Sequence, residues 1–282
     1  MFKPSIRGTN FTLGVTGFVE QERQISIAVD EFDLLDPTPY KVFVQLEPPE
    51  IVPNVVQRLI EQYTFYNLII AWQENVLDNC PNAVKYIYGN CSWALNPVDA
   101  CDVSQKKFEV SYLTSAKTMC KGHYFRHEVF NKLPSKIGQV SITKHMSPPV
   151  LECKRPLLYP YQYSIIIENA KHVNWCTEKL IDCLLSRAIP IYYGAPNVGE
   201  YFDASGILTF SSNEELQSVL KGLTPEFYQS RLAAIEHNFH EAMKYVDVHK
   251  RLNNEIRRRL SDNTWNISPQ RPSEAVRKRL HR

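Results

Sequence analysis

The sequence has no continuous apolar run of about eighteen residues, the length that a helix needs to cross a bilayer. Its first residues also lack the apolar core of a secretory signal peptide. Short-period repeats and low-complexity tracts are missing, and 44% hydrophobic and 22% charged residues are typical of globular proteins, which excludes fibrous and disordered classes. These absences predict a soluble cytoplasmic protein, and 282 residues are enough for two domains of ordinary size.

Cysteine, histidine and glycine form no recognised metal or cofactor motif. The seven cysteines are irregularly spaced, which indicates reduced thiols rather than a disulfide framework. His123 and His127 have a spacing that suits zinc on a helix, but no third ligand is evident nearby, and the same applies to His237 and His240. A glycine-rich phosphate loop is also absent. We therefore expect no metal and no required cofactor.

The net charge of +2 is too small to indicate nucleic-acid binding, but it is unevenly distributed. Residues 250–282 carry ten Lys or Arg against three acidic residues. We interpret this basic tail as a solvated helix and a frayed end, with weak contact to a membrane surface or an anionic partner as the alternative. A nucleic-acid role is disfavoured, because Trp265 is the only aromatic residue in the tail.

Apolar and amphipathic segments alternate along the chain, which predicts an α/β fold. Residues 72–102 are rich in Asn, Pro, Cys and aromatic residues, and we expect an irregular loop there. The expected strands are 25–29, 41–46, 66–71, 107–113, 138–143, 163–167, 189–193 and 206–210, and the expected helices are 52–63, 120–133, 177–188, 214–220 and 225–246. This order predicts two α/β halves with a cleft between them.

Residues 159–197 are the most informative segment. The strand at 163–167 ends in Glu168 and Asn169, and Thr177 then starts a helix whose first turn holds Glu178 and Lys179. Ligands of parallel sheets bind at the carboxyl ends of strands, and anions bind at helix N-termini. The segment therefore predicts a site for phosphate and ribose. The alternative is that Thr177 only caps the helix, while Glu178 favours its dipole and Lys179 is solvated.

The string ENAKHVNWCTEKLIDCLLSRAIPIYYGAPN resembles the C-terminal signature of the α-1,3-fucosyltransferases, glycosyltransferase family 10. The resemblance covers residues 155–215 well and the rest weakly. It implies the GT-B fold, in which two Rossmann-like domains face each other across a cleft. It also implies a nucleoside diphosphate sugar as donor and inversion of the anomeric centre.

The resemblance implies a role for several residues. Glu178 would hold the donor ribose and Lys179 the diphosphate, while Trp175 stands where the family usually has tyrosine. The upstream string SAKTMCKGHYFRHEVFNKL resembles another family segment and makes Arg126 the arginine that grips the pyrophosphate. The donor site is thus expected to contain Arg126, Glu168, Asn169, Trp175, Thr177, Glu178, Lys179 and Gly194.

A catalytic base is harder to assign. Inversion by single displacement needs a carboxylate that takes the proton of the acceptor hydroxyl. QLEPPEI faintly resembles the family's Glu-Ser-Pro strand end, and this makes Glu47 the expected base. Glu50, Glu74 and Asp30 are rivals, and a surface glutamate before a Pro-Pro turn is the alternative interpretation of Glu47.

The resemblance also suggests a division of the chain. Residues 1–103 would bind the acceptor, residues 104–250 the nucleotide sugar, and the basic helix and tail at 251–282 would pack back on the first domain. Glycosyltransferases of the other common fold place a metal on an Asp-x-Asp triplet, which is absent here. We therefore expect metal-independent stabilisation of the leaving group by Arg126, Lys179 and helix N-termini.

The predicted function is inverting transfer of a monosaccharide to an oligosaccharide hydroxyl. Family analogy implies fucose from GDP-fucose. The lack of a membrane anchor makes the chain resemble soluble bacterial or large-virus enzymes, and exostosin-like and virus-type relatives keep a pentose such as xylose from UDP-xylose open. The alternative is a non-catalytic nucleotide- or glycan-binding module of the same fold. Hydrolysis or transfer of the donor sugar would distinguish an enzyme from such a module.

Overall fold

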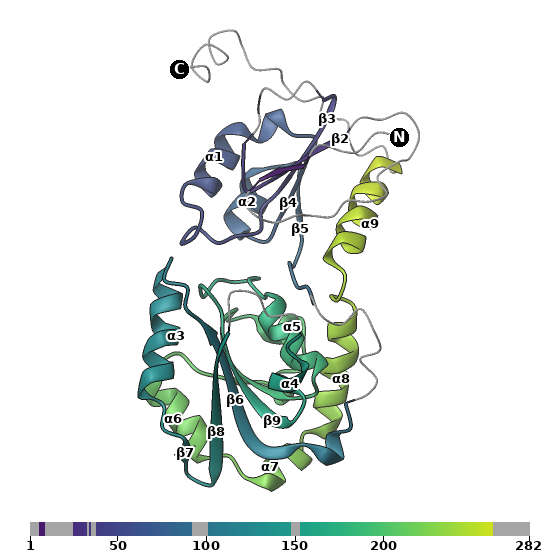
Figure 1. The fold of residues 1–282 in the computed structure, drawn as a ribbon. Helices are drawn as coiled ribbons and strands as arrows, with labels where there is room; N and C mark the ends of the chain where they lie inside the picture. The colour runs from purple at the N-terminus through teal and green to yellow at the C-terminus, as the bar shows by residue number, and fades with distance from the viewer. Residues whose placement is uncertain are drawn as a thin grey trace. The chain divides into compact units, whose positions relative to one another are not determined.

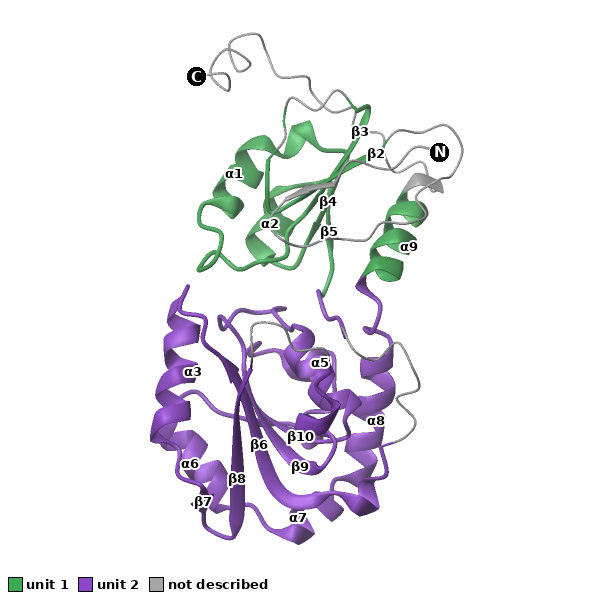
Figure 2. Cartoon of the chain, in the orientation of Figure 1, with its two compact units in different colours: residues 1–87, 249–282 green, residues 88–248 purple. Residues whose placement is uncertain are grey.

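The computed structural model describes residues 6–8, 25–32, 34, 38–91, 101–147 and 153–261. Most of the predicted basic tail, residues 262–282, lies outside the described residues. The chain forms two compact units, one made of residues 1–87 with 249–282 and the other of residues 88–248 (Figure 2). The acceptor-binding and donor-binding roles predicted for the two parts of the chain stay predictions.

The first unit is built on a parallel sheet. Its described strands are, in sheet order, β1 (Ile6–Gly8), β2 (Ile25–Val29), β3 (Tyr40–Val44), β4 (Leu68–Ala71) and β5 (Ala83–Lys85). The helices of this unit are α1 (Val55–Gln62), α2 (Glu74–Asn79) and most of α9 (Val248–Ser261). Its core joins Phe43 of β3 and Ile69 of β4 to Leu59 of α1 and Val76 of α2, all fully buried.

The prediction of an irregular loop over residues 72–102 was wrong in part, because α2 and β5 lie there. These elements are six and three residues long, too short to give a periodic apolar pattern. β5 exists through its pairing with β4, in which Ala83 lies opposite Ile69. Such pairing is a tertiary effect that the local sequence does not encode.

The second unit contains a mixed sheet of six described strands. Their order is β11 (Leu208–Thr209), β10 (Ile189–Tyr193), β9 (Tyr161–Ile167), β6 (Lys107–Ser115), β8 (Val140–Ser147) and β7 (Lys136–Ile137), and only β7 runs antiparallel to its neighbour. The helices are α3 (Lys121–Lys132), α4 (Arg155–Leu158), α5 (Glu178–Leu185), α6 (Asn213–Lys221), α7 (Pro225–Gln229) and α8 (Leu232–Met243). Figure 1 shows α3 and α6 on one side of this sheet and α4, α5 and α8 on the other.

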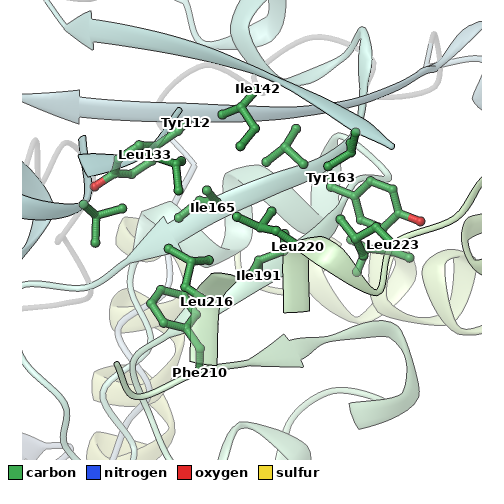
Figure 3. Packing of buried hydrophobic residues seen from close by; sticks show 14 of the residues in the cluster. Tyr112, Leu133, Ile142, Tyr163, Ile165, Ile191, Phe210, Leu216, Leu220 and Leu223 are labelled. Atoms are coloured by element: carbon green, nitrogen blue, oxygen red, sulfur yellow. The ribbon is translucent and has the colours of Figure 1, made fainter. Parts of the chain in front are cut away.

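Helices on both faces explain the apolar strands in the middle of this sheet. Every residue of β9 is buried, as expected of a central parallel strand. Figure 3 shows side chains of β6, β8, β9 and β10 packing with side chains of α6. The helix predicted over 225–246 is divided into α7 and α8, which are separated by Ser230 and Arg231.

These two sheets with their flanking helices confirm the predicted α/β fold with two Rossmann-like units. The described residues include no helix that combines the length and the apolar character needed to cross a bilayer.

Ile191 tests the packing of the second core, because it is fully buried in the centre of β10. We expect Ile191→Ala to lower the free energy of unfolding by about 2–5 kcal/mol, since the lost methyl groups leave a cavity. Urea unfolding followed by fluorescence measures the change. Thr209→Ala, at an exposed position on the neighbouring β11, is the control and should change stability by less than about 0.5 kcal/mol. Equal losses in both variants would contradict this view of the core.

Candidate functional site

The polar residues that follow β9 and β10 lie at the same edge of the second sheet. β9 and β10 are parallel neighbours, with Ile167 opposite Tyr193, so Glu168 and Gly194 leave the sheet side by side. The Glu168 N–H donates to the Tyr193 carbonyl at 2.8 Å, which extends the strand pairing by one residue. The first residues predicted to bind a ligand therefore lie at the carboxyl edge of this sheet.

The same edge receives the N-terminus of α5. Thr177 is the N-cap, and its hydroxyl accepts the Lys179 N–H at 3.3 Å, as the sequence predicts. Glu178 and Lys179 form the first turn, where unpaired N–H groups and the helix dipole favour an anion.

Glu168 connects the strand end to the helix start. Its side chain is fully buried, and its two carboxylate oxygens accept the Thr177 N–H at 3.0 Å and the Thr177 hydroxyl at 2.6 Å. The Lys179 ammonium lies 3.4 Å from the second oxygen. Glu168 makes all of these contacts with other residues of the chain, so its role in the structure is to hold the turn at Thr177 in place.

The charged pair that follows Thr177 is partly open to solvent. Lys179 Nζ lies 2.9 Å from Glu178 Oε1 and 3.1 Å from the Thr177 hydroxyl, and the two side chains are 23% and 31% exposed. Burial acts to raise the pKa of Glu178, but the ammonium groups of Lys179 and Lys154 outweigh it and hold that pKa well below its ordinary value. Glu178 is therefore ionised at neutral pH and able to accept two hydrogen bonds.

Arg126 approaches the site from α3. The guanidinium is only 6% exposed, and one terminal nitrogen donates to the side-chain oxygen of Asn169. Among the described residues, no group accepts a hydrogen bond from its buried Nε. Burial lowers the pKa of Arg126 and the nearby carboxylates of Glu168 and Glu178 oppose this, but a guanidinium stays charged in proteins. A buried cation with a spare donor beside Asn169 is a natural partner for an anion.

The backbone of α3 comes unusually close to Asn169. A Cβ at Gly122 would lie 2.0 Å from the Asn169 carbonyl oxygen, so no larger residue fits in this conformation. The Cys120 thiol also donates to that carbonyl, at 3.4 Å. The sequence analysis missed Gly122 and Cys120, because a contact between segments almost fifty residues apart leaves no local signal.

The loop between β9 and α5 is fixed by an asparagine pair that the sequence analysis also missed. Asn174 has the left-handed backbone conformation, with φ of 65°, which asparagine tolerates better than most residues. Its N–H donates to the Asn197 side-chain oxygen at 2.8 Å, and the Asn197 amide donates back at 2.8 Å. Trp175, the next residue and a predicted donor contact, is 3% exposed, so most of its ring packs inside the protein.

His123 and His127, considered above as zinc ligands, take part in hydrogen bonds around α3. His123 Nδ1 lies 3.1 Å from the Met119 N–H, and burial together with Arg126 lowers the pKa of His123 to about 4. His127 Nε2 lies 2.7 Å from the Ser115 carbonyl oxygen. In the part of the chain that the structure describes, no three His, Cys, Asp or Glu side chains gather as a metal site would require.

Glu47 belongs to the first unit. It follows β3 by three residues, and its N–H donates to the Asp30 carboxylate at 2.8 Å. Of the rival bases, Asp30 is buried next to Glu47, while Glu50 is exposed to solvent. The structure thus brings the predicted donor residues together in the second unit, around the carboxyl ends of β9 and β10, and places the predicted base after β3 in the first unit.

Comparison with known proteins identifies the relatives of the chain. The model of the C-terminal part of glycosyltransferase family 10 (fucosyltransferase) matches residues 103–259. The α-(1,3)-fucosyltransferase FucT of Helicobacter pylori is 38% identical over 50 residues, which are 18% of this chain and only 10% of that protein. The matched part is thus far less than two thirds of the relative's length.

Two solved structures with a partly similar course of the chain are an α1,3-fucosyltransferase and TarM. An α1,3-fucosyltransferase with GDP-fucose is 16% identical, with 79% of this chain and 80% of that chain covered and a TM-score of 0.49. TarM is 10% identical, with 86% of this chain and 54% of that chain covered and a TM-score of 0.48.

Gly194 is a sharp test of the site, because its surroundings leave no room for a side chain. A Cβ there would lie 2.2 Å from the Tyr192 hydroxyl and 2.7 Å from Glu168 Cγ. We expect Gly194→Ala to lower the free energy of unfolding by about 1–3 kcal/mol through overpacking and to displace Glu168. Thermal unfolding measures the first effect.

Gly199→Ala is the matched control. Its nearest neighbour would be Ala204 Cβ at 3.4 Å, an ordinary contact, so the melting temperature should hardly change. A Gly194→Ala protein as stable as the Gly199→Ala protein would contradict the packing described around Glu168.

Proposed function

The chain belongs to glycosyltransferase family 10, and from this premise we propose that it transfers fucose from GDP-fucose to a hydroxyl group of an oligosaccharide, with inversion at the anomeric carbon. The family match covers more than half of the chain and includes all the residues proposed to bind the donor. The observation that carries the proposal is that two cations and a helix N-terminus share the same two carboxylates. Glu168 and Glu178 both contact Lys179, their charges both act on Arg126, and Glu168 also binds Thr177 at the N-terminus of α5.

These groups match the chemistry of a nucleoside diphosphate. Arg126 and Lys179 supply two positive charges, and the first turn of α5 supplies unpaired N–H groups, so together they would bind the two phosphates. Glu178, held ionised by its neighbours, would accept the hydrogen bonds of the ribose diol. Lys179 would exchange its contact with Glu178 for a phosphate oxygen when the donor binds.

The same cations would serve the reaction itself. Negative charge grows on the β-phosphate as the bond between the anomeric carbon and the phosphate oxygen breaks. Fixed positive charges lower the energy of that transition state without any rearrangement of solvent. We therefore propose that Arg126 and Lys179 stabilise the leaving diphosphate and that no metal is required.

Glu168, Thr177 and Gly194 would act on the donor indirectly. Glu168 is fully buried and already accepts the two donors of Thr177, so we propose that it positions the first turn of α5. Gly194 would provide the space for Tyr192 and Glu168, and the buried Trp175 would support the donor site from within the loop that precedes α5.

We propose Glu47 as the base. The acceptor oxygen attacks the anomeric carbon on the face opposite the diphosphate, Glu47 takes its proton, and the bond to the diphosphate breaks in the same step. The position of Glu47 after the central strand β3 supports this role. Cytoplasmic location is kept as part of the proposal, on the irregular spacing of the seven cysteines.

Nucleotide binding tests the donor site. We expect Lys179→Ala to weaken GDP binding about 10-fold or more, because a charge-assisted hydrogen bond contributes about 1.5–3 kcal/mol. Isothermal titration calorimetry with GDP and with UDP measures this. Lys132→Ala removes an exposed charge at the far end of α3 and should leave affinity within about twofold. Tighter binding of UDP than GDP would favour a pentose donor, and unchanged affinity in Lys179→Ala would overturn the proposed donor site.

Turnover tests the base. We expect Glu47→Gln to lower the rate of transfer by about 10²-fold or more while GDP affinity stays unchanged, because the amide cannot take a proton. Glu50→Gln, an exposed residue three positions along, is the control and should keep wild-type turnover. Full activity in Glu47→Gln would remove Glu47 as base. The absence of donor turnover in the wild-type protein with every acceptor tried would favour a non-catalytic binding module.

A further inference from the structure

Asp30, the first residue after β2, has an unusual backbone and an unusual environment. Its φ is 53°, in the left-handed region that few residues other than glycine adopt, and its side chain is 5% exposed. The Asp30 N–H donates to the Val44 carbonyl at 3.1 Å, so the pairing of β2 with β3 continues to this point. The turn that follows directs the carboxylate to the segment that leaves β3.

Both oxygens of Asp30 bind the backbone of that segment. Oδ1 accepts the Leu46 N–H at 2.9 Å and Oδ2 accepts the Glu47 N–H at 2.8 Å. On the other side, the Trp72 indole donates to the Leu46 carbonyl at 3.1 Å. Three hydrogen bonds from β2 and from the end of β4 therefore fix the peptide groups on both sides of Leu46.

The backbone of Glu47 is constrained from its other side as well. Pro48 follows, and the residue before a proline is restricted to extended conformations. With its N–H bound to Asp30 and its carbonyl side limited by Pro48, Glu47 has little freedom to change the direction in which its side chain leaves the chain.

We propose that Asp30 is a positioning residue for Glu47, and that its carboxylate aims the base by holding the Leu46 and Glu47 amides. This inference rests on the proposed role of Glu47 and names a second residue for the same reaction. Asp30 acts through the backbone, so it does not itself touch the acceptor.

The cost of burying this carboxylate supports a functional reason for it. Burial raises the pKa of Asp30 to about 7, the two backbone hydrogen bonds oppose the rise, and the charge of Glu47 adds to it. Glu47 is the titratable group among the described residues whose charge acts on Asp30. The ionised carboxylate accepts both amides, whereas the protonated acid places a hydrogen on one oxygen and loses one of them. The positioning effect is therefore about half present near pH 7, grows as the pH rises above this value and is lost as the pH falls below it.

A double-mutant cycle with Glu47 tests the proposal. We expect Asp30→Asn to lower kcat about 10-fold or more in the wild-type background, with the KM for the donor and the Kd for GDP within about twofold. In the Glu47→Gln background, Asp30→Asn should change kcat by less than about twofold, because there is no base left to aim. We expect kcat of the wild-type protein to rise through about pH 7 as Asp30 ionises, and the pH profile of Asp30→Asn should lack this rise.

Asn67→Ala is the matched structural control. The Asn67 side chain accepts the Lys41 N–H at 2.7 Å, so this variant removes a buried side-chain bond to the backbone at the opposite edge of the same sheet. It should keep the wild-type pH profile and a kcat within about twofold. Circular dichroism shows whether each variant folds, and Asp30→Ser replaces Asp30→Asn if the latter does not.

The outcomes separate this inference from the function on which it rests. Full activity in Glu47→Gln overturns the proposed base and the inference together. A wild-type kcat in Asp30→Asn beside an inactive Glu47→Gln overturns the inference alone. An equal loss of kcat from Asp30→Asn in both backgrounds also overturns it, because Asp30 would then act independently of Glu47.

Discussion

The buried carboxylate of Glu168 is the interaction on which the second unit's site depends. It is the first residue after the central strand β9, and it binds both the N–H and the hydroxyl of Thr177. Thr177 in turn caps α5 and fixes where Glu178 and Lys179 start the helix. The Asn174–Asn197 pair holds the middle of the ten-residue loop between β9 and α5, and the bonds of Glu168 to Thr177 hold its end, where the charged first turn of α5 begins.

The carboxylates of Glu168 and Glu178 act on both cations of the site. Lys179 is surrounded by the carboxylates of Glu168 and Glu178, and Arg126 is balanced by the same two groups. The donor site that we propose would therefore present cations whose positions are already set by protein carboxylates before the diphosphate binds.

The sequence predicted those parts of the fold and site that are encoded locally. The apolar run that became β9 and the cap at Thr177 follow from residue type and spacing, and both are present. The sequence did not predict that Glu168 is buried and bonds to Thr177, because an acidic residue at a strand end could equally contact a ligand. The hydrogen bond between Arg126 and Asn169 joins segments 43 residues apart, and the left-handed turn at Asn174 depends on a partner in a later loop. Such features are set by tertiary packing, which single-sequence patterns do not contain.

The two units use the same physical device at their carboxyl edges. Asp30 follows β2 as Glu168 follows β9, and each is a buried carboxylate that accepts two hydrogen bonds. The donors are the Leu46 and Glu47 amides after β3 in one case, and the amide and hydroxyl of the α5 N-cap Thr177 in the other. Burying an acid costs free energy that an apolar residue would not, so stability alone does not favour either residue. Each carboxylate instead orients the groups that donate to it, because its two oxygens lie in one plane and accept one hydrogen bond each. In both units the donors so oriented include or directly precede a residue that we propose to act in the reaction, Glu47 in one case and Glu178 in the other, and a proposed reactive group benefits from a fixed geometry.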